Sequence, residues 1–290
     1  MRMPDALSAS KMLFNQLATD ALRYVPWSLR KRVSRTPLVG ALQRWYFAKL
    51  INECPFVHEV DAGPAKGVKF EISLPEDKGI WTGCYEQEFA MRLASAASKG
   101  GVAYDIGGWH GYFAAVMAVQ GAREVHVFEP LPANARHIER LLELNSEYPI
   151  QLHRVAIASH DTVMNLLITK DPSMAKLEVT GSDWSRTTIP VVVRSIDSIV
   201  KSGEARAPDL IKIDVEGAEL FVLQGARETI RSKRPDIFAE IHSPLLLHEC
   251  EEFLETLGYG IERLDETGPV SSSVFQIRAI AQSTRTWLRE

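Results

Sequence analysis

Short apolar runs alternate with longer helical patterns along the last two thirds of the chain. VAYDI precedes YFAAVMAV, EVHVF precedes a segment from Pro132 to Asn145, DLIKID precedes ELFVLQGARETI, and DIFAEI precedes LLHECEEFLETL. Runs of about four to eight apolar residues are typical of buried strands, and apolar residues at every third or fourth position are typical of helices. Strands that alternate with helices predict a parallel sheet with helices on both faces.

This pattern changes in two places. QLHRVAI predicts another strand, and we expect the segment after it, with MNLLIT and TTIPVVVR, to be irregular. YGIERL and VFQIRAI predict two late strands with no helix between them, so they should pair antiparallel at one edge. The predicted fold class is therefore α/β: a doubly wound, mostly parallel sheet with an antiparallel C-terminal strand pair and an N-terminal helical extension.

The first third of the chain has a different organisation. Helical patterns over about 8–24 and 36–52 are interrupted by prolines, and GVKFEISL then alternates as a hairpin strand does. We expect a basic helical extension over 1–55, a hairpin and helix over 56–98, and a ligand-binding domain over 99–290.

Charge is distributed unevenly along the chain. Residues 1–50 hold nine Lys or Arg and two Asp, a net +7, whereas the whole chain carries −4, which leaves −11 for the rest. In LRYVPWSLRKRV the basic residues are interleaved with apolar ones, as in an interfacial helix. We expect this basic arm to contact an anionic membrane, a lipid-linked substrate or an acidic partner. The alternative is that it packs on the acidic body of its own chain or of a second copy in a homo-oligomer. That acidic body argues against nucleic-acid substrates.

The composition, with 46% hydrophobic and 24% charged residues, is that of an ordinary globular protein. The three cysteines, Cys54, Cys84 and Cys250, are scattered without metal-site spacing, and no signal peptide or membrane-spanning run is visible. These features predict free thiols and a cytoplasmic location, with peripheral membrane association through the basic arm as an option.

The VAYDI strand leads into a loop, DIGGWHG, that contains Asp105, Gly107, Gly108 and Gly111. The glycine spacing does not match the dinucleotide fingerprint, and the loop lacks the Gly-Lys-Ser/Thr ending of a P-loop. Because a carboxylate at the strand end repels a pyrophosphate and attracts a cation, we expect the loop to bind a positively charged nucleoside rather than a phosphate. Glycine lets the backbone approach such a ligand closely.

HVFEP ends the next strand with Glu129, 24 residues after Asp105. A carboxylate at this position suits the two ribose hydroxyls of a nucleoside. A nucleoside with a ribose and a positive methionyl end is S-adenosylmethionine, which we expect as the cofactor. The alternative is that each acid only favours the start of the helix that follows its strand.

DLIKIDVEGAE carries four charged residues on the strand and at its exit, namely Lys212, Asp214, Glu216 and Glu219. Carboxylates near an apolar strand are costly unless they have partners. Asp214 should stand at the strand end and face the cofactor. The other three fit a structural network of a lysine and its acids equally well.

Together, DIGGWHG, FEP, SIDSIV, LIKIDVEGAE and RPDIFAEIH resemble the FkbM family of methyltransferases over about residues 80 to 265. The resemblance implies a Rossmann-like sheet with strand order 3-2-1-4-5 and S-adenosylmethionine-dependent methylation of hydroxyl groups, often on sugars or natural products. It also implies that Asp105, Gly107 and Gly111 border the methionyl part of the cofactor and that Glu129 holds the ribose.

The remaining candidates on the cofactor side are Gly108 and, in QLHRVAI, Ala156. The loop departs from the common family pattern, Asp-x-Gly-Ala-Asn-x-Gly, because Gly108 and Trp109 stand where Ala and Asn are usual. Trp109 either stacks on the ligand or packs within the protein.

In the fold implied by the resemblance, the strands DLIKID and DIFAEI are neighbours, so Asp214 and His242 should meet around one acceptor. We predict His242 as the general base, with ionisation near pH 6.5 if unperturbed, and Asp214 as the group that orients the hydroxyl or the imidazole. Lys212 and Glu216 are further catalytic candidates. No metal is predicted, although Asp214, Glu240 and His242 could hold one together.

The predicted function is O-methylation of a hydroxyl on a sugar, glycan or natural product. Trp81 and Tyr85 of WTGCYEQEF, or the polar segment 160–187, are candidates for the acceptor site. The alternatives are an N-methyltransferase and a non-catalytic module that only binds S-adenosylmethionine or adenosine.

Overall fold

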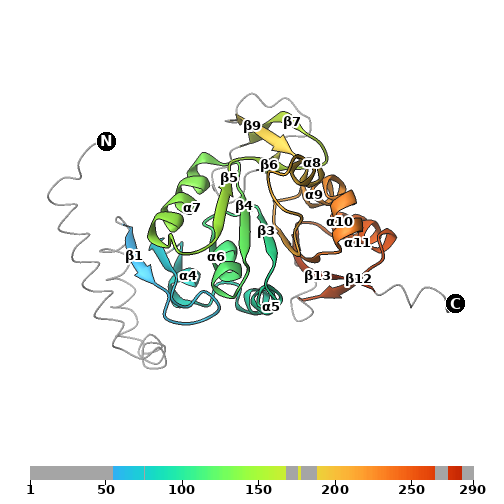
Figure 1. Cartoon of the computed structure of the whole chain (residues 1–290). Coiled ribbons are helices and arrows are strands. Elements are labelled where there is room, and N and C mark those ends of the chain that lie inside the picture. The colour runs from blue at the N-terminus through green and yellow to red at the C-terminus, as the bar shows by residue number, and fades with distance from the viewer. Residues whose placement is uncertain (1–54, 75, 168–175, 178–187, 265–273, 283–290) are drawn as a thin grey trace. The chain divides into compact units, whose positions relative to one another are not determined.

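The structure of the chain is a computed structural model (Figure 1). It describes residues 55–74, 76–167, 176–177, 188–264 and 274–282. The chain divides into two compact units, Met1–Glu88 and Phe89–Glu290. The helical patterns predicted within residues 1–54, and with them the basic arm, lie outside the described residues. Within the described part of the chain, no helix is long and apolar enough to cross a membrane.

The first unit contains the hairpin that the alternation in GVKFEISL predicts. Strand β1 (Phe56–Glu59) pairs antiparallel with β2 (Lys69–Ile72), and the short helix α4 (Lys78–Thr82) follows. Helix α5 (Gln87–Ala97) begins at the end of this unit and continues into the second.

The second unit is built on a seven-stranded sheet with the order β12-β13-β11-β10-β3-β4-β5. Its strands are β3 (Val102–Ile106), β4 (Glu124–Phe128), β5 (Ile150–His153), β10 (Leu210–Ile213), β11 (Asp236–Ile241), β12 (Tyr259–Arg263) and β13 (Phe275–Ala281). The first five are parallel, and β13 pairs antiparallel with both β11 and β12. In chain order the parallel strands lie 3-2-1-4-5, so the predicted fold class and its antiparallel edge are confirmed.

Helices pack on both faces of this sheet, as the strand–helix alternation predicts. One face carries the apolar cluster of α8 (Ile196–Ser202), α9 (Glu219–Gly225), α10 (Arg227–Lys233) and α11 (Pro244–Thr256). On the other face, Phe89 of α5 packs edge-to-face against Phe238 of β11 and against Phe113 of α6 (Tyr112–Val119). Successive residues of β11 therefore serve opposite layers, since Ile237 belongs to the first cluster.

Local sequence sets the ends of the helices that border the site. Helix α7 (Pro132–Leu144) begins with a proline in its first turn and ends at Asn145, as predicted. At the start of α11, the hydroxyl of Ser243 accepts a hydrogen bond from the backbone N–H of Leu246 at 3.1 Å, and Pro244 occupies the first turn. The cap at Ser243 fixes where the chain turns from β11 into α11.

The segment expected to be irregular after QLHRVAI instead forms a second sheet, in the order β6-β9-β7-β8. Its strands are β6 (Ala156–Ile157), β7 (Thr162–Leu167), β8 (Lys176–Leu177) and β9 (Thr188–Arg194). The expectation was wrong because Pro190 interrupts the apolar run of β9, and a proline within such a run argues against a strand, whereas β7 buries too few residues to show a clear strand pattern.

Two other boundaries differ from the prediction. QLHRVAI is divided between β5 of the large sheet and β6 of the small one. The single helix expected through ELFVLQGARETI is two helices, α9 and α10, which meet at Ala226. Helix α8, whose first turn is capped by Ser195, was not predicted.

Candidate functional site

The predicted site residues come from the carboxyl ends of four neighbouring parallel strands. Asp105 lies in β3, Glu129 directly follows β4, Asp214 directly follows β10, and His242 directly follows β11. In an open parallel sheet, this edge is where ligands bind.

The glycine loop after β3 lies against the exit of β10. Gly107 has φ +81°, and a Cβ at this position would overlap the carbonyl oxygen of Asp214. The carbonyl of Gly107 accepts a hydrogen bond from Lys212 Nζ at 3.1 Å, and the backbone N–H of Asp214 donates to the carbonyl of Ile106 at 2.9 Å. Only glycine fits here, so the predicted cofactor loop and the predicted catalytic acid are held together through the backbone.

The departure of this loop from the family pattern has a steric cause. A Cβ at Gly108 would overlap the side chain of Val127, which leaves no room for the usual alanine. Trp109 has φ +46° and its ring stacks on His110, with centroids 3.9 Å apart and planes 11° apart. Gly111, with φ +78°, precedes α6 as its N-cap. Trp109 thus has a ring partner within the loop, and stacking on a ligand stays the alternative role.

Asp105 is fully buried, and its charge is used inside the protein. Lys212 Nζ lies 3.3 Å from Asp105 Oδ1 and 3.5 Å from Asp214 Oδ2. Lys212 and Asp105 are direct partners in the register of β10 and β3. Burial raises the pKa of Asp105, and the charge of Lys212 opposes that rise. Asp105 and Lys212 thus form a buried ion pair, and the contribution of Asp105 to cofactor binding stays a prediction.

Glu129 is also buried, but it is held by backbone amides. Its Oε2 accepts a hydrogen bond from the N–H of Trp109 at 2.9 Å, and its Oε1 accepts one from the N–H of Leu131 at 2.8 Å. Burial raises the pKa of Glu129 to about 7, although these hydrogen bonds act to lower it. Each carboxylate oxygen has a second lone pair, so Glu129 can accept further hydrogen bonds from hydroxyl groups.

Ala156, the remaining residue predicted on the cofactor side, lies in β6 and is buried. It pairs with Val193 in the small sheet rather than with a strand of the large one. Its contribution to cofactor binding stays a prediction.

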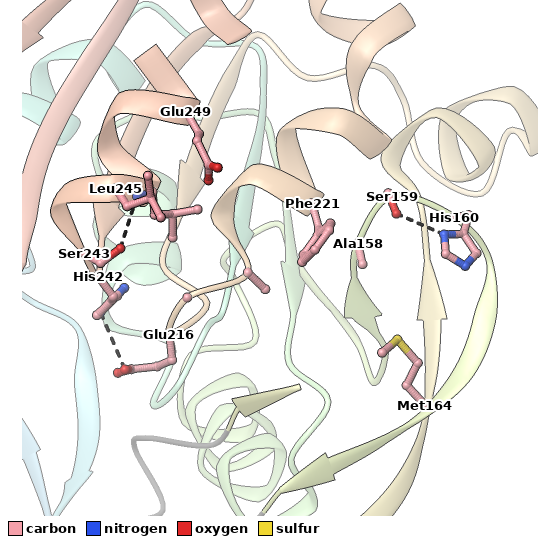
Figure 2. A pocket seen from close by; sticks show the side chains of 13 residues that line it. Ala158, Ser159, His160, Met164, Glu216, Phe221, His242, Ser243, Leu245 and Glu249 are labelled. Atoms are coloured by element: carbon pink, nitrogen blue, oxygen red, sulfur yellow. Dashed lines mark hydrogen bonds and ion pairs between the residues drawn. The ribbon is translucent and has the colours of Figure 1, made fainter. Parts of the chain in front are cut away.

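Carboxylates surround His242. Its Nδ1 lies 2.8 Å from Oε1 of Glu219, and its Nε2 lies 3.7 Å from Oδ1 of Asp214. The same Nε2 lies 3.6 Å from Oε2 of Glu216 (Figure 2). Burial alone would lower the pKa of His242. The hydrogen bond and charge of Glu219, together with the charges of Asp214 and Glu216, outweigh burial and raise that pKa to about 9. His242 therefore carries a proton at neutral pH.

The sequence did not predict that Glu219 contacts His242. Glu219 is fully buried in the first turn of α9 and orients the imidazole, whereas the sequence indicated only a structural network. Glu216 has φ +55°, a conformation that costs a residue with a side chain about 1–3 kcal/mol and that recurs at functional sites. Glu216 and Glu219 both belong to VEGAE, the short connection that leads from β10 into the first turn of α9.

The same cluster contains a set of groups that can hold a cation. Asp214, Glu240 and His242 each offer one ligand atom, and these atoms lie within 4.8 Å of one another. The side-chain amide of Gln276 donates to Oε2 of Glu240 at 3.0 Å. Burial and the nearby charge of Asp214 raise the pKa of Glu240. Two carboxylates and an imidazole are a ligand set found around divalent metals.

A pocket of about 560 Å³ opens beside Glu216 and His242 (Figure 2). It is lined by Ala158, Ser159, His160, Met164, Glu216, Gly217, Ala218, Phe221, His242, Ser243, Leu245, Leu246 and Glu249. Most of these residues were not predicted, because they come from three segments that only the fold brings together.

Trp81 and Tyr85 belong to the first unit, and their role at the acceptor site stays a prediction.

A family model matches more than half of the chain. The model of the methyltransferase FkbM domain matches residues 101–261. Over 162 residues the chain is 29% identical to hexuronic acid methyltransferase AglP of Haloferax volcanii. That stretch covers 54% of the chain and 63% of AglP, so the chain spans less than two thirds of this curated relative.

Solved structures with a similar arrangement include two methyltransferases. One is methyltransferase FkbM of Methylobacillus flagellatus, at 20% identity and a TM-score of 0.46, covering 61% of this chain and 42% of that one. The other is precorrin-6y C5,15-methyltransferase of Geobacter metallireducens, at 14% identity and a TM-score of 0.43, covering 68% of this chain and 89% of that one.

Proposed function

Because the chain belongs to the FkbM methyltransferase family, we propose that it transfers a methyl group from S-adenosylmethionine to a hydroxyl group of a sugar, glycan or other natural product. The observation that carries this proposal is the position of His242 and Asp214 at neighbouring strand ends, directly beside the loop of Gly107. The hexuronic acid in the name of AglP supports a sugar as the class of acceptor.

The residues available for the cofactor fit a nucleoside with a positive charge. Glu129 offers buried carboxylate oxygens at the end of β4, where a ribose would need hydroxyl acceptors. The carboxylates of Asp214 and Glu216 give the adjoining edge a negative potential. When bound, S-adenosylmethionine supplies a methyl group activated by its sulfonium charge.

In the molecules whose His242 is neutral, a minority at neutral pH because its pKa is about 9, the proton of the acceptor hydroxyl is proposed to move to Nε2 of His242. Nδ1 of this residue is engaged by Glu219 at 2.8 Å, so the ring is held with Nε2 on the side of Asp214 and Glu216. Asp214 is proposed to orient the imidazole and to stabilise the imidazolium that forms, because its Oδ1 lies 3.7 Å from Nε2, while the single proton of the hydroxyl is directed at His242. Positioning and general-base catalysis together account for much of the rate of such reactions.

The protonation of Glu129 gives a test of cofactor binding. Its pKa of about 7 means that part of the free protein holds a proton on this group at neutral pH. Hydrogen bonds from hydroxyls favour the ionised form, so binding should release a proton and affinity should rise with pH from about 5 to 8. Calorimetric titration with S-adenosylmethionine in buffers of different ionisation enthalpy measures both effects.

Glu129→Gln is expected to bind S-adenosylmethionine about ten- to a hundredfold more weakly, because a hydrogen bond to a charged group contributes about 1.5–3 kcal/mol. Proton release should be lost as well. Glu143→Gln, which changes an exposed acid of α7, serves as the control. Wild-type affinity and proton release in folded Glu129→Gln would remove Glu129 from the cofactor site.

A chelator tests whether the cluster of Asp214, Glu240 and His242 acts through a metal. We expect turnover to survive dialysis against EDTA, because Lys212 and the protonated His242 already bring positive charge to these carboxylates. Loss of turnover that Mg²⁺ or Mn²⁺ restores would instead assign these three residues to a catalytic metal.

A further inference from the structure

The pocket beside His242 has the position of an acceptor site. His242 and Glu216 form part of its wall, so a ligand in the pocket would lie next to the proposed general base. Its other walls come from the starts of α9 and α11 and from the chain between β6 and β7 (Figure 2). A volume of about 560 Å³ lies within the range of small-molecule sites, about 300–1,000 Å³.

Part of this pocket is an exposed apolar surface. Phe221 of α9 is 38% exposed and Leu245 of α11 is 68% exposed, and both line the pocket. Met164 of β7 lines it from the side of the small sheet. Large apolar side chains that stay in contact with water and line a concave site suit a ligand with an apolar face. The flat ring of Phe221 can cover the C–H face of a sugar.

Two carboxylates contribute negative charge to the pocket. Glu216 and Glu249 line it, whereas none of its described lining residues is Lys or Arg. The positive charge of His242 already faces Glu219, Asp214 and Glu216. A ligand carboxylate would therefore meet like charges, which repel, and the described lining offers no lysine or arginine to receive it. Hydroxyl groups, in contrast, can donate hydrogen bonds to the carboxylates of Glu216 and Glu249.

We infer that this pocket binds an uncharged, hydroxyl-bearing sugar ring and discriminates against a uronic acid. The inference refines the proposed function and rests on it for the meaning of the site. It separates the chain from the hexuronic acid named for AglP, because the apolar surface around Phe221 and the acids Glu216 and Glu249 favour a neutral ring.

Matched glycosides test this inference directly. The 4-nitrophenyl glucoside and glucuronide, and the corresponding galactoside and galacturonide, differ only in a CH2OH or a carboxylate at C6. Titrated into the full-length protein and followed by saturation-transfer NMR and calorimetry, each neutral glycoside should bind at least about tenfold more tightly than its acid. Equal or tighter binding of the acids, or no binding of any of the four, would overturn the inference.

Two variants link the preference to the pocket. Glu249→Gln should narrow the difference in affinity between each neutral glycoside and its uronide. Phe221→Ala should weaken the binding of both neutral glycosides about tenfold or more. Val192→Ala, which changes an exposed apolar residue of β9 outside the pocket lining, should bind as the wild type does. Unchanged binding in both pocket variants would place the glycosides elsewhere and refute the inference.

The binding test of this inference can fail or succeed independently of the methyl-transfer test of the proposed function, because binding is measured without S-adenosylmethionine. Glycoside binding in a protein that never transfers a methyl group would refute the methyltransferase proposal alone. Methyl transfer with a preference for uronides would refute only the inference about the pocket.

Discussion

Replacing His242 with alanine is expected to lower the rate of methyl transfer about 10²–10⁴-fold and to leave the affinity for S-adenosylmethionine unchanged. This is the range typical for removal of a general base. Asp214→Asn should also lose turnover while binding the cofactor, because Asp214 lies 3.7 Å from Nε2 of His242. Steady-state kinetics and calorimetric titration of the same preparations separate the two quantities. His248→Ala, on the exposed side of α11, is the matched control.

The pH profile makes this prediction specific to His242. Only the neutral imidazole accepts a proton, and the pKa of His242 is raised to about 9 by its carboxylate neighbours against the effect of burial. The rate should therefore rise with pH and level off above about 9, rather than near the 6.5 of an unperturbed histidine. Asp214→Asn removes one of the charges that raise this pKa, so the residual rate should level off at lower pH. Near-normal turnover in both variants, or a flat profile, would contradict the role of His242.

Lys212→Met is expected to lower the free energy of unfolding by about 3–5 kcal/mol, the usual cost of breaking a buried ion pair from one side. Lys212 and Asp105 are both buried, and Nζ lies 3.3 Å from Oδ1. Denaturant unfolding measures the loss. The loss of unfolding free energy should shrink as pH falls, because protonation of Asp105 removes the negative charge that Lys212 balances in the wild type. Adding Asp105→Asn to Lys212→Met should recover part of the stability.

An exposed pair provides the control for this experiment. Lys233 lies 2.8 Å from Asp209 with both side chains substantially exposed, so Lys233→Met should cost about 1 kcal/mol or less. A loss below about 1 kcal/mol for Lys212→Met would mean that Lys212 does not stabilise the fold, and a direct role in chemistry would then be the better account of this residue.

The fold could be predicted largely because its central strands are buried on both faces. DLIKID and DIFAEI are mostly apolar for that reason, each interrupted by one charged residue, and Pro132 marks a helix start by its own geometry. The small sheet escaped prediction because Pro190 interrupts the apolar run of β9 and because β7 is largely exposed and has no clear strand pattern.

The site was predictable to the extent that it depends on strand ends. Asp214 and His242 could be expected to meet because their strands are neighbours in a 3-2-1-4-5 order. The pairing of Asp105 with Lys212 depends on strand register, and the contact of Glu219 with His242 depends on how α9 starts beside β11. Neither the Asp105–Lys212 pairing nor the Glu219–His242 contact can be read from composition or spacing. The raised pKa of His242 depends on the contact with Glu219.

The most direct measurement is to supply the purified chain with S-adenosylmethionine carrying a ¹³C-labelled methyl group. The acceptors would be a set of neutral sugars, nucleotide sugars and lipid-linked glycans, with mass spectrometry and ¹³C NMR locating the label. The account predicts a label on a hydroxyl oxygen with the wild type and with His248→Ala, and loss of that product with His242→Ala and with Asp214→Asn. A label on nitrogen, or an O-methyl product formed equally well by both variants, would contradict it.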